Sequence, residues 1–388
     1  MKKPTPKIIN NFISRGVEEI ISKDTLNKKL RSGKILRIKH GIDPTAKDLH
    51  IGYAVTYRKL KTLQDMGHKI VFLIGDFTAR FGDPTGEGKE RPIRSKKEVL
   101  NAAKSYIASL GRILDIKKIE VRYNSEWYDR MDIDKFLRMI SAGTANQMIH
   151  REMFQKRLKS GKEIRLHELL YPMLQGYDSV MLKSDMTVIG SDQLFNELVG
   201  RKLQELHKQS PQDILVTNLL VGTDGKRKMS QSLGNYIAIN EKPNEMYGKI
   251  MSLPDEALSS YFELLTDINL ANIKKIKGIA LKKMLARNIV EWLYEKKSSL
   301  KAEHHFESVF QSRKTPDDIP TYNVKKGEHI INFLTSNKVI SSKSEARRLI
   351  LAGAVDFNGS KIISPDFTPD KDGILKVGKR RFMKLNIK

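Results

Sequence analysis

The sequence contains no cysteine. Disulfide bonds and thiolate metal sites are therefore excluded, which agrees with a reducing compartment, and we expect a cytoplasmic protein. No run of about 18 apolar residues is present, so no segment is expected to span a membrane. Residues 1–16 contain lysines but no continuous apolar stretch, which argues against a secretory signal.

Acidic residues are scarce relative to basic ones. The 388 residues include 70 Lys and Arg against 45 Asp and Glu, a formal net charge of +25 at pH 7. A polyanionic partner such as nucleic acid explains this excess, because neutralising phosphates releases condensed counterions. A generally basic proteome or a solubility device explains it equally well, so charge alone leaves both open. The length suggests two or three domains.

Strand-like and helix-like patterns alternate in the first part of the chain. Short apolar runs predict buried parallel strands, and the periodic segments between them predict helices. A strand, a helix and a strand within roughly 40 residues have the spacing of a nucleotide-binding unit, so we expect an α/β fold with a Rossmann-like parallel sheet. Strands are expected at 35–42, 69–75, 119–123, 186–189 and 214–220, and helices at 50–67, 95–114 and 132–140.

The pattern changes after about residue 235. Residues 243–315 are rich in Lys and Leu and predict helices with little strand. Residues 314–324 hold Pro316 and Pro320 among polar residues and predict a linker. Beyond the linker, residues 327–388 hold 12 basic against 6 acidic residues and predict a separate compact unit.

The segment DPTAKDLHIGY at 43–53 places a histidine and a glycine at an expected helix start. A helix amino terminus offers unpaired N–H groups and partial positive charge to a phosphate. His50 can donate a hydrogen bond to a phosphate oxygen, and Gly52 lets a nucleotide approach the backbone closely. Taken alone, the triplet is explained better by a helix cap or a core position.

The segment KRKMSQSLGN at 226–235 is a lysine-rich loop with serine and glycine. Such a loop can close over a triphosphate and stabilise the charge that develops on it. Taken alone, a charge cluster of this kind is usually a solvated loop.

Together, in this order and with room for a parallel sheet between them, the two segments resemble the HIGH and KMSKS signatures of class I aminoacyl-tRNA synthetases. The resemblance implies an enzyme that activates an amino acid with ATP. It implies catalytic roles for His50, Gly52, Lys228 and Ser230. It implies ATP contacts for Asp43, Thr45, His50, Gly52, Tyr53, Asp192, Lys228 and Met229.

Three segments resemble the tyrosyl branch of this class, namely DPT at 43–45, YPMLQGYD at 171–178 and GSDQ at 190–193. Tyr171, Gln175 and Asp178 share one helix face, and a phenol, an amide and a carboxylate suit a zwitterion with a polar tip. By itself this stretch is explained by a plain amphipathic helix.

The resemblance implies the amino-acid contacts residue by residue. Tyr171, Gln175 and Asp83 would bind the substrate ammonium, Asp178 its phenolic hydroxyl, and Gln193 the substrate. Lys39 belongs to the same pocket, at a position where many bacterial relatives have a tyrosine that touches the substrate hydroxyl.

The carboxy-terminal unit contains SEARRLILAGAVDFNG at 344–359, a helix followed by a glycine break and a strand. It resembles the S4 RNA-binding domain. Lys343, Arg347 and Arg348 can project outward and contact tRNA phosphates, which gives affinity more than sequence readout. An ordinary basic appendage is the alternative.

Two residues depart from the signatures. Tyr53 stands at the last HIGH position, and Gln231 replaces the second lysine of KMSKS. Both usual residues would stabilise triphosphate charge in the transition state, so activation would be slower without compensation. Lys226 and Arg227 are candidates for that compensation.

The complete interpretation is a tyrosyl-tRNA synthetase. Residues 1–235 would form the catalytic domain, with a dimer-forming insertion near 125–165, residues 236–320 a helical anticodon-binding domain, and residues 327–388 an S4-like domain. Its substrates would be ATP with Mg²⁺, L-tyrosine and tRNA(Tyr), with no dedicated metal site and no tightly bound cofactor. The alternatives are a tryptophanyl-tRNA synthetase and a catalytically weak RNA-binding protein that kept this fold.

Overall fold

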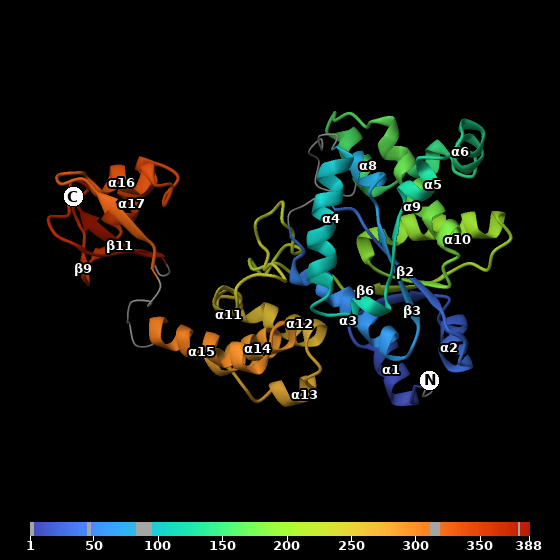
Figure 1. The fold of residues 1–388 in the computed structure, drawn as a ribbon, viewed down its shortest axis with the longest axis horizontal. Helices are drawn as coiled ribbons and strands as arrows, with labels where there is room; N and C mark the ends of the chain where they lie inside the picture. Colours follow the sequence, from blue (N-terminus) through green and yellow to red (C-terminus); the bar gives the residue numbers. More distant parts are fainter. Residues whose placement is uncertain (1–3, 45–47, 83–94, 311–318, 379–380) are drawn as a thin grey trace. The chain divides into compact units, whose positions relative to one another are not determined.

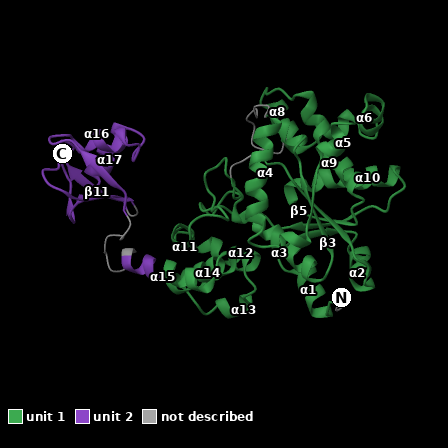
Figure 2. Cartoon of the chain, viewed as in Figure 1, with its two compact units in different colours: residues 1–302 green, residues 303–388 purple. Residues whose placement is uncertain are grey.

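The computed structural model describes residues 4–44, 48–82, 95–310, 319–378 and 381–388 (Figure 1). The chain divides into two compact units, residues 1–302 and residues 303–388 (Figure 2). Among the helices in these ranges, none is long and apolar enough to cross a membrane.

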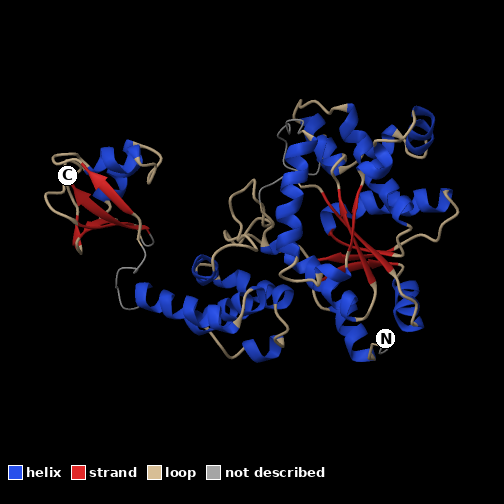
Figure 3. Cartoon of the chain, viewed as in Figure 1, coloured by secondary structure: helices blue, strands red, loops and turns tan. Residues whose placement is uncertain are grey.

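The first unit is built on a six-stranded sheet with the order β1-β6-β5-β2-β3-β4 (Figure 3). All neighbouring strands are parallel except β1 and β6. The strands are β1 (Val17–Ile21), β2 (Arg37–Ile42), β3 (Lys69–Ile74), β4 (Glu120–Tyr123), β5 (Met186–Gly190) and β6 (Asp213–Thr217). The five parallel strands and the α/β class predicted from the sequence are confirmed.

The antiparallel strand β1 was not predicted. Its sequence, VEEII, does not alternate regularly, and its pairing with β6 shifts register between Val17 and Glu19. The pairing joins residues that lie about 200 positions apart in the sequence, so no local pattern reveals it.

The strand order creates a crevice. From β2 the chain proceeds to β3 and β4 on one side, whereas β5 and β6 lie on the other. In a parallel sheet, ligands bind outside the carboxyl ends of the strands where the order reverses. That point lies between β2 and β5.

Helices cover both faces of the sheet. Because successive side chains of a strand point to opposite faces, the contacts of β3 show which helices pack on each face. Phe72 of β3 contacts Tyr57 of α3 (Ile51–Asp65), with ring centroids 6.4 Å apart. Its neighbours Val71 and Leu73 point to the other face and join a core cluster with α9 (Leu166–Leu182) and α10 (Leu194–Leu206). The remaining helices near the sheet are α1 (Pro6–Ser14), α2 (Lys23–Ser32) and α4 (Lys96–Leu110).

The segment between β4 and α9 is a helical insertion. It contains α5 (Ser125–Tyr128), α6 (Ile133–Ile140), α7 (Ala145–Ile149) and α8 (Glu152–Lys159). Trp127, Met139 and Met148 belong to the same core cluster as Leu73. The insertion therefore packs on the first unit close to the carboxyl edge of the sheet.

Of the residues 243–315 predicted to be helical, 243–310 form helices and the loops between them, and 311–315 lie outside the described residues. The helices are α11 (Pro243–Met251), α12 (Asp255–Leu265), α13 (Leu270–Ile273), α14 (Gly278–Leu293) and α15 (Lys296–Phe310). The Arg15 side chain donates to the backbone carbonyls of Phe262, Glu263 and Ile268 at 2.8–2.9 Å. Phe262 and Glu263 lie in the last turn of α12 and Ile268 lies three residues beyond it, so the guanidinium caps the helix end and attaches it to the amino-terminal segment.

The second unit has a five-stranded sheet with the order β7-β11-β10-β8-β9. Its elements are β7 (Thr321–Val324), α16 (Ile330–Ser336), α17 (Lys343–Leu351), β8 (Val355–Phe357), β9 (Ser360–Lys361), β10 (Gly373–Val377) and β11 (Arg381–Ile387). Ala346 and Ile350 of α17 are buried in its core, and Leu349 packs against it.

The linker predicted at 314–324 is wrong at its end. Residues 321–324 form β7, which pairs in parallel with residues 384–387 of β11. This pairing with the far end of the unit orders residues 321–324, and residues 314–318 of the predicted linker lie outside the described residues.

Candidate active site

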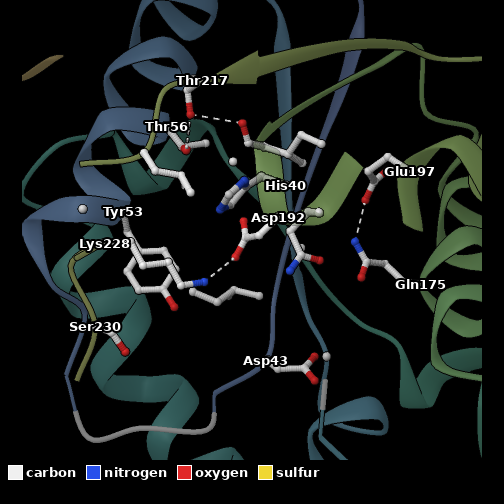
Figure 4. Close-up of a pocket in the computed structure, with 18 of the residues that line it drawn as sticks. His40, Asp43, Tyr53, Thr56, Gln175, Asp192, Glu197, Thr217, Lys228 and Ser230 are labelled. Carbon is white, nitrogen blue, oxygen red and sulfur yellow. Dashed lines mark hydrogen bonds and ion pairs between the residues drawn. The ribbon is translucent and has the colours of Figure 1, made fainter. Parts of the chain in front are cut away.

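A pocket opens at the carboxyl ends of β2 and β5, where the strand order reverses (Figure 4). Thr45 and Asp83 lie outside the described residues. Every other residue that the sequence assigned to ATP, tyrosine or catalysis lines the pocket, namely Lys39, Asp43, His50, Gly52, Tyr53, Tyr171, Gln175, Asp178, Asp192, Gln193, Lys228, Met229 and Ser230.

The HIGH-like segment begins α3. His50 is the residue before the helix, and its Nδ1 accepts the N–H of Gly52 at 3.2 Å. A β-carbon at position 52 would lie 2.7 Å from that Nδ1, so this close approach requires glycine. Burial, and then the charge of Lys228, lowers the pKa of His50 to about 4. The ring is therefore neutral at pH 7, and since Nδ1 accepts, its proton lies on Nε2 and is available for donation.

Asp43 connects β2 to the helix that carries Tyr171. Its carboxylate accepts the hydroxyl of Thr78 at 2.7 Å and that of Tyr171 at 2.8 Å. A β-carbon on Gly75 would lie 1.9 Å from Asp43 Oδ1, so glycine is required at this position too. Asp43 thereby fixes the Tyr171 phenol at the mouth of the pocket.

The KMSKS-like loop is held by Asn235. The Asn235 side chain accepts the N–H of Ser230 at 2.9 Å and donates to the carbonyl of Lys228 at 3.1 Å and to Asp224 at 3.0 Å. The chain just after the loop also bonds back to the HIGH-like segment, because residues 50 and 238 form an isolated bridge. Lys228 Nζ lies 3.3 Å from Asp192 Oδ2, so the loop lysine reaches the end of β5.

The two departures from the signatures have different surroundings. Tyr53 lines the pocket, and its ring centroid lies 4.5 Å from that of His50. The Gln231 side chain instead donates to the Asp48 carbonyl. Lys226 and Arg227 do not line the pocket, and Arg227 pairs with Asp224 at 3.1 Å. This geometry does not favour the compensating role suggested for them.

Asp178 is a buried acid of the pocket, with 4% of its surface exposed. Its Oδ1 accepts the indole N–H of Trp127 at 3.1 Å. Burial raises the pKa of Asp178 to about 7, although Lys39 and hydrogen bonds from Tyr128, Trp127 and Asn124 act in the opposite direction. The group is thus close to the midpoint of its titration at neutral pH.

Lys39 forms a buried ion pair with Glu197, at 2.8 Å from Oε2 and 2.9 Å from Oε1. Its ammonium also donates to the Ser179 hydroxyl at 2.7 Å. An ammonium has three N–H groups, so these contacts engage all of them. Lys39 therefore lies at the pocket without an N–H left for a ligand.

Sequence reasoning missed two ionisable side chains of the pocket, His40 and Glu197. His40 lies next to Lys39 on the opposite face of β2, with Nδ1 3.1 Å from the Val188 carbonyl; burial lowers the pKa of His40 to about 4. Glu197 lies four residues after Gln193, so helical spacing from the GSDQ segment was a usable signal.

Solved structures share the fold. A mitochondrial tyrosyl-tRNA synthetase from Aspergillus nidulans superposes with a TM-score of 0.63 at 22% identity, covering 78% of this chain and 94% of that one. The tyrosyl-tRNA synthetase of Archaeoglobus fulgidus complexed with L-tyrosine superposes with a TM-score of 0.60 at 22% identity, covering 76% of this chain and 99% of that one.

Sequence relatives are nearer. Residues 31–311 match the family of class I tRNA synthetases for W and Y, and residues 311–383 match the SYY-like C-terminal domain of tyrosine–tRNA ligases. A tyrosine–tRNA ligase of Dehalococcoides mccartyi is 45% identical over 97% of this chain and 98% of its own length. One of Thermotoga maritima is 43% identical over 98% of both. The chain belongs to the tyrosine–tRNA ligase family of class I aminoacyl-tRNA synthetases.

Proposed function

We propose that this protein is a tyrosine–tRNA ligase, which activates L-tyrosine with ATP and transfers it to the 3′ end of tRNA(Tyr). The observation that carries the proposal is the pocket itself. It brings both signature segments to the same crevice as the helix face of Tyr171, Gln175 and Asp178. Family membership supports it, because the curated relatives carry this activity in their names. The cytoplasm would supply the substrates.

The proposed reaction has two steps. The tyrosine carboxylate attacks the α-phosphorus of ATP, which forms tyrosyl-adenylate and releases pyrophosphate. A hydroxyl of the terminal tRNA ribose then attacks the carbonyl carbon, which forms the ester and releases AMP. No side chain becomes covalently bound, so positioning and electrostatics account for catalysis.

Individual residues then have defined tasks. Lys228 and the Nε2 proton of His50 would stabilise charge on the phosphates, and Gly52 leaves room for the nucleotide. Asp192 would hold the ribose, and Asp178 would accept the phenolic hydroxyl. Mg²⁺ would arrive with ATP, as a hard cation bound mainly through phosphate oxygens.

Three parts of the chain would divide the work. Residues 1–235 would activate tyrosine, residues 236–320 would contact the anticodon stem, and residues 327–388 would act as an S4-like domain. The insertion near 125–165 would form a homodimer. Exposed apolar side chains in and beside it support that role, with Ile133 71%, Leu137 53% and Leu166 80% exposed.

ATP–pyrophosphate exchange with tyrosine, phenylalanine and tryptophan tests the function. Exchange with tyrosine alone is expected. Exchange with tryptophan instead would identify the tryptophanyl alternative. A folded chain that binds tRNA but gives no exchange with any of the three would identify the RNA-binding alternative, which the residues Tyr53 and Gln231 kept open.

The basic face of α17 gives a separate prediction. Lys343, Arg347 and Arg348 are exposed, opposite the buried Ala346 and Ile350. The triple substitution to glutamate should raise KM for tRNA at least tenfold, because each lost phosphate contact weakens binding and like charges repel.

Tyrosine-dependent pyrophosphate exchange should stay within about twofold in the same variant, since the residues that line the pocket belong to the first unit. The salt dependence of tRNA binding should also become shallower. Unchanged KM for tRNA at low salt would show that this face is an ordinary basic surface.

A further inference from the structure

The carboxylate of Glu197 joins two parts of the amino-acid end of the pocket. Oε1 accepts the Lys39 ammonium at 2.9 Å and the Gln175 amide nitrogen at 2.8 Å. Oε2 accepts Lys39 at 2.8 Å and the Gln212 amide at 2.7 Å. Lys39 and Glu197 are each 2% exposed, so these contacts form without competition from bulk water.

An ionised carboxylate only accepts hydrogen bonds, so it determines which way the Gln175 amide faces. Nε2 must point toward Glu197, and Figure 4 shows the oxygen on the other side of the amide. That oxygen accepts the Asn196 side chain at 2.7 Å. A carbonyl oxygen has two lone pairs, so one remains for a ligand donor.

The direction of this amide matters for a cationic ligand group. An amide oxygen attracts an ammonium, whereas an amide NH₂ group repels it. If the amide rotated by half a turn, Gln175 would present its donors to the substrate ammonium and lose the Glu197 contact. The ion pair therefore selects the one orientation that suits an amino acid.

Lys39 supplies the counter-charge of Glu197 in this buried position, at 2.8 Å from Oε2. A buried carboxylate without a partner would take up a proton, and a protonated acid could accept or donate. The pair adds little net stability by itself, because desolvation offsets the attraction of the charges. Its presence at the pocket therefore fits a role in orientation better than a role in stability.

We propose that Glu197, paired with Lys39, is a positioning residue that orients the Gln175 amide toward the ammonium group of the substrate. The proposal deepens the proposed function and rests on it. Under this proposal Lys39 does not contact tyrosine directly, as the sequence suggested, but acts on the substrate indirectly through Glu197.

Two ligands separate this role from a general effect on the pocket. Tyrosinol has the ammonium, the phenol and a primary alcohol, and its analogue 3-(4-hydroxyphenyl)propan-1-ol lacks only the ammonium. Binding of both is measured by calorimetry to the wild-type chain and to Glu197→Gln. The substitution should weaken the binding of tyrosinol roughly tenfold. Binding of the analogue should stay within about twofold.

A second variant controls for damage to the fold. Glu197→Gln leaves Lys39 buried without a counter-charge, which destabilises a protein. The double variant Lys39→Met with Glu197→Gln removes both charges and should recover the melting temperature. It should not recover the preference for tyrosinol, because an amide in place of the Glu197 carboxylate both donates and accepts and no longer dictates the direction of Gln175.

Equal losses for both ligands, or a preference for tyrosinol that returns together with the melting temperature, would assign Glu197 a structural role only and overturn the inference. A wild-type chain that binds neither ligand contradicts the proposed function, and the inference with it. Loss of the preference for tyrosinol in the single and the double variant supports the proposed function and the inference.

Discussion

Replacing Lys228 by alanine should lower kcat for tyrosine activation by about 10²–10³-fold, the usual loss for one charge-stabilising donor in an active site. Lys228 lines the pocket beside Asp192, and Gln231 points to the Asp48 carbonyl instead of supplying a second cation. The KMSKS-like loop thus has one lysine at the pocket among the residues that the structure describes. KM for tyrosine should change little, because this lysine would act on the phosphates.

Lys226 and Arg227 provide the matched control. Both lie on the same loop but outside the pocket, and Arg227 pairs with Asp224. Their joint replacement by alanine should leave kcat within about threefold. The measurement is single-turnover formation of tyrosyl-adenylate at saturating ATP. A double variant as slow as the Lys228 variant would restore the compensating role that the sequence suggested for these two residues.

Replacing Asp178 by asparagine should raise KM for tyrosine by about ten- to a hundredfold and leave KM for phenylalanine nearly unchanged. A hydrogen bond to a charged group contributes about 1.5–3 kcal/mol, and phenylalanine has no hydroxyl to lose. Asp178 is buried and accepts hydrogen bonds from Tyr128, Trp127 and Asn124, which leaves one of the roughly four lone-pair sites of its carboxylate for the substrate. Pyrophosphate exchange with both amino acids measures the change.

The same substitution should make the free protein more stable at alkaline pH. Burial raises the pKa of Asp178 from 3.8 to about 7, so the folded state binds more protons than the unfolded state between these values. Stability from this group is present at low pH and is lost as pH rises to about 7. Between pH 5.5 and 8 the loss is about 2 kcal/mol, at 1.36 kcal/mol per pKa unit.

Asparagine has no such titration, so urea unfolding at the two pH values should show the variant gaining that amount over the wild type. An equal difference in unfolding free energy at both pH values would mean that the Asp178 carboxyl titrates normally. The wild type keeps a destabilising buried acid, and discrimination of the phenolic hydroxyl is the functional reason that we infer for it.

The sequence alone determined the fold class and most of the pocket. Central parallel strands are buried on both faces, so β3, β5 and β6 appear as apolar runs in the sequence. The role of Gly52 could be predicted from the geometry of one helix start. The shared face of Tyr171, Gln175 and Asp178 could be predicted from the spacing along one helix. Signature segments are recognisable because catalysis fixes residue types at short spacing.

The tertiary structure decided what depends on partners far away in the chain. Lys39 and Glu197 are 158 positions apart, and only the tertiary structure brings the Glu197 carboxylate of α10 to the Lys39 ammonium of β2. The edge strand β1 and the strand β7 likewise exist through pairing with distant segments. A buried charge is tolerated only where its counter-charge is placed within a few ångströms, and local sequence does not carry that information.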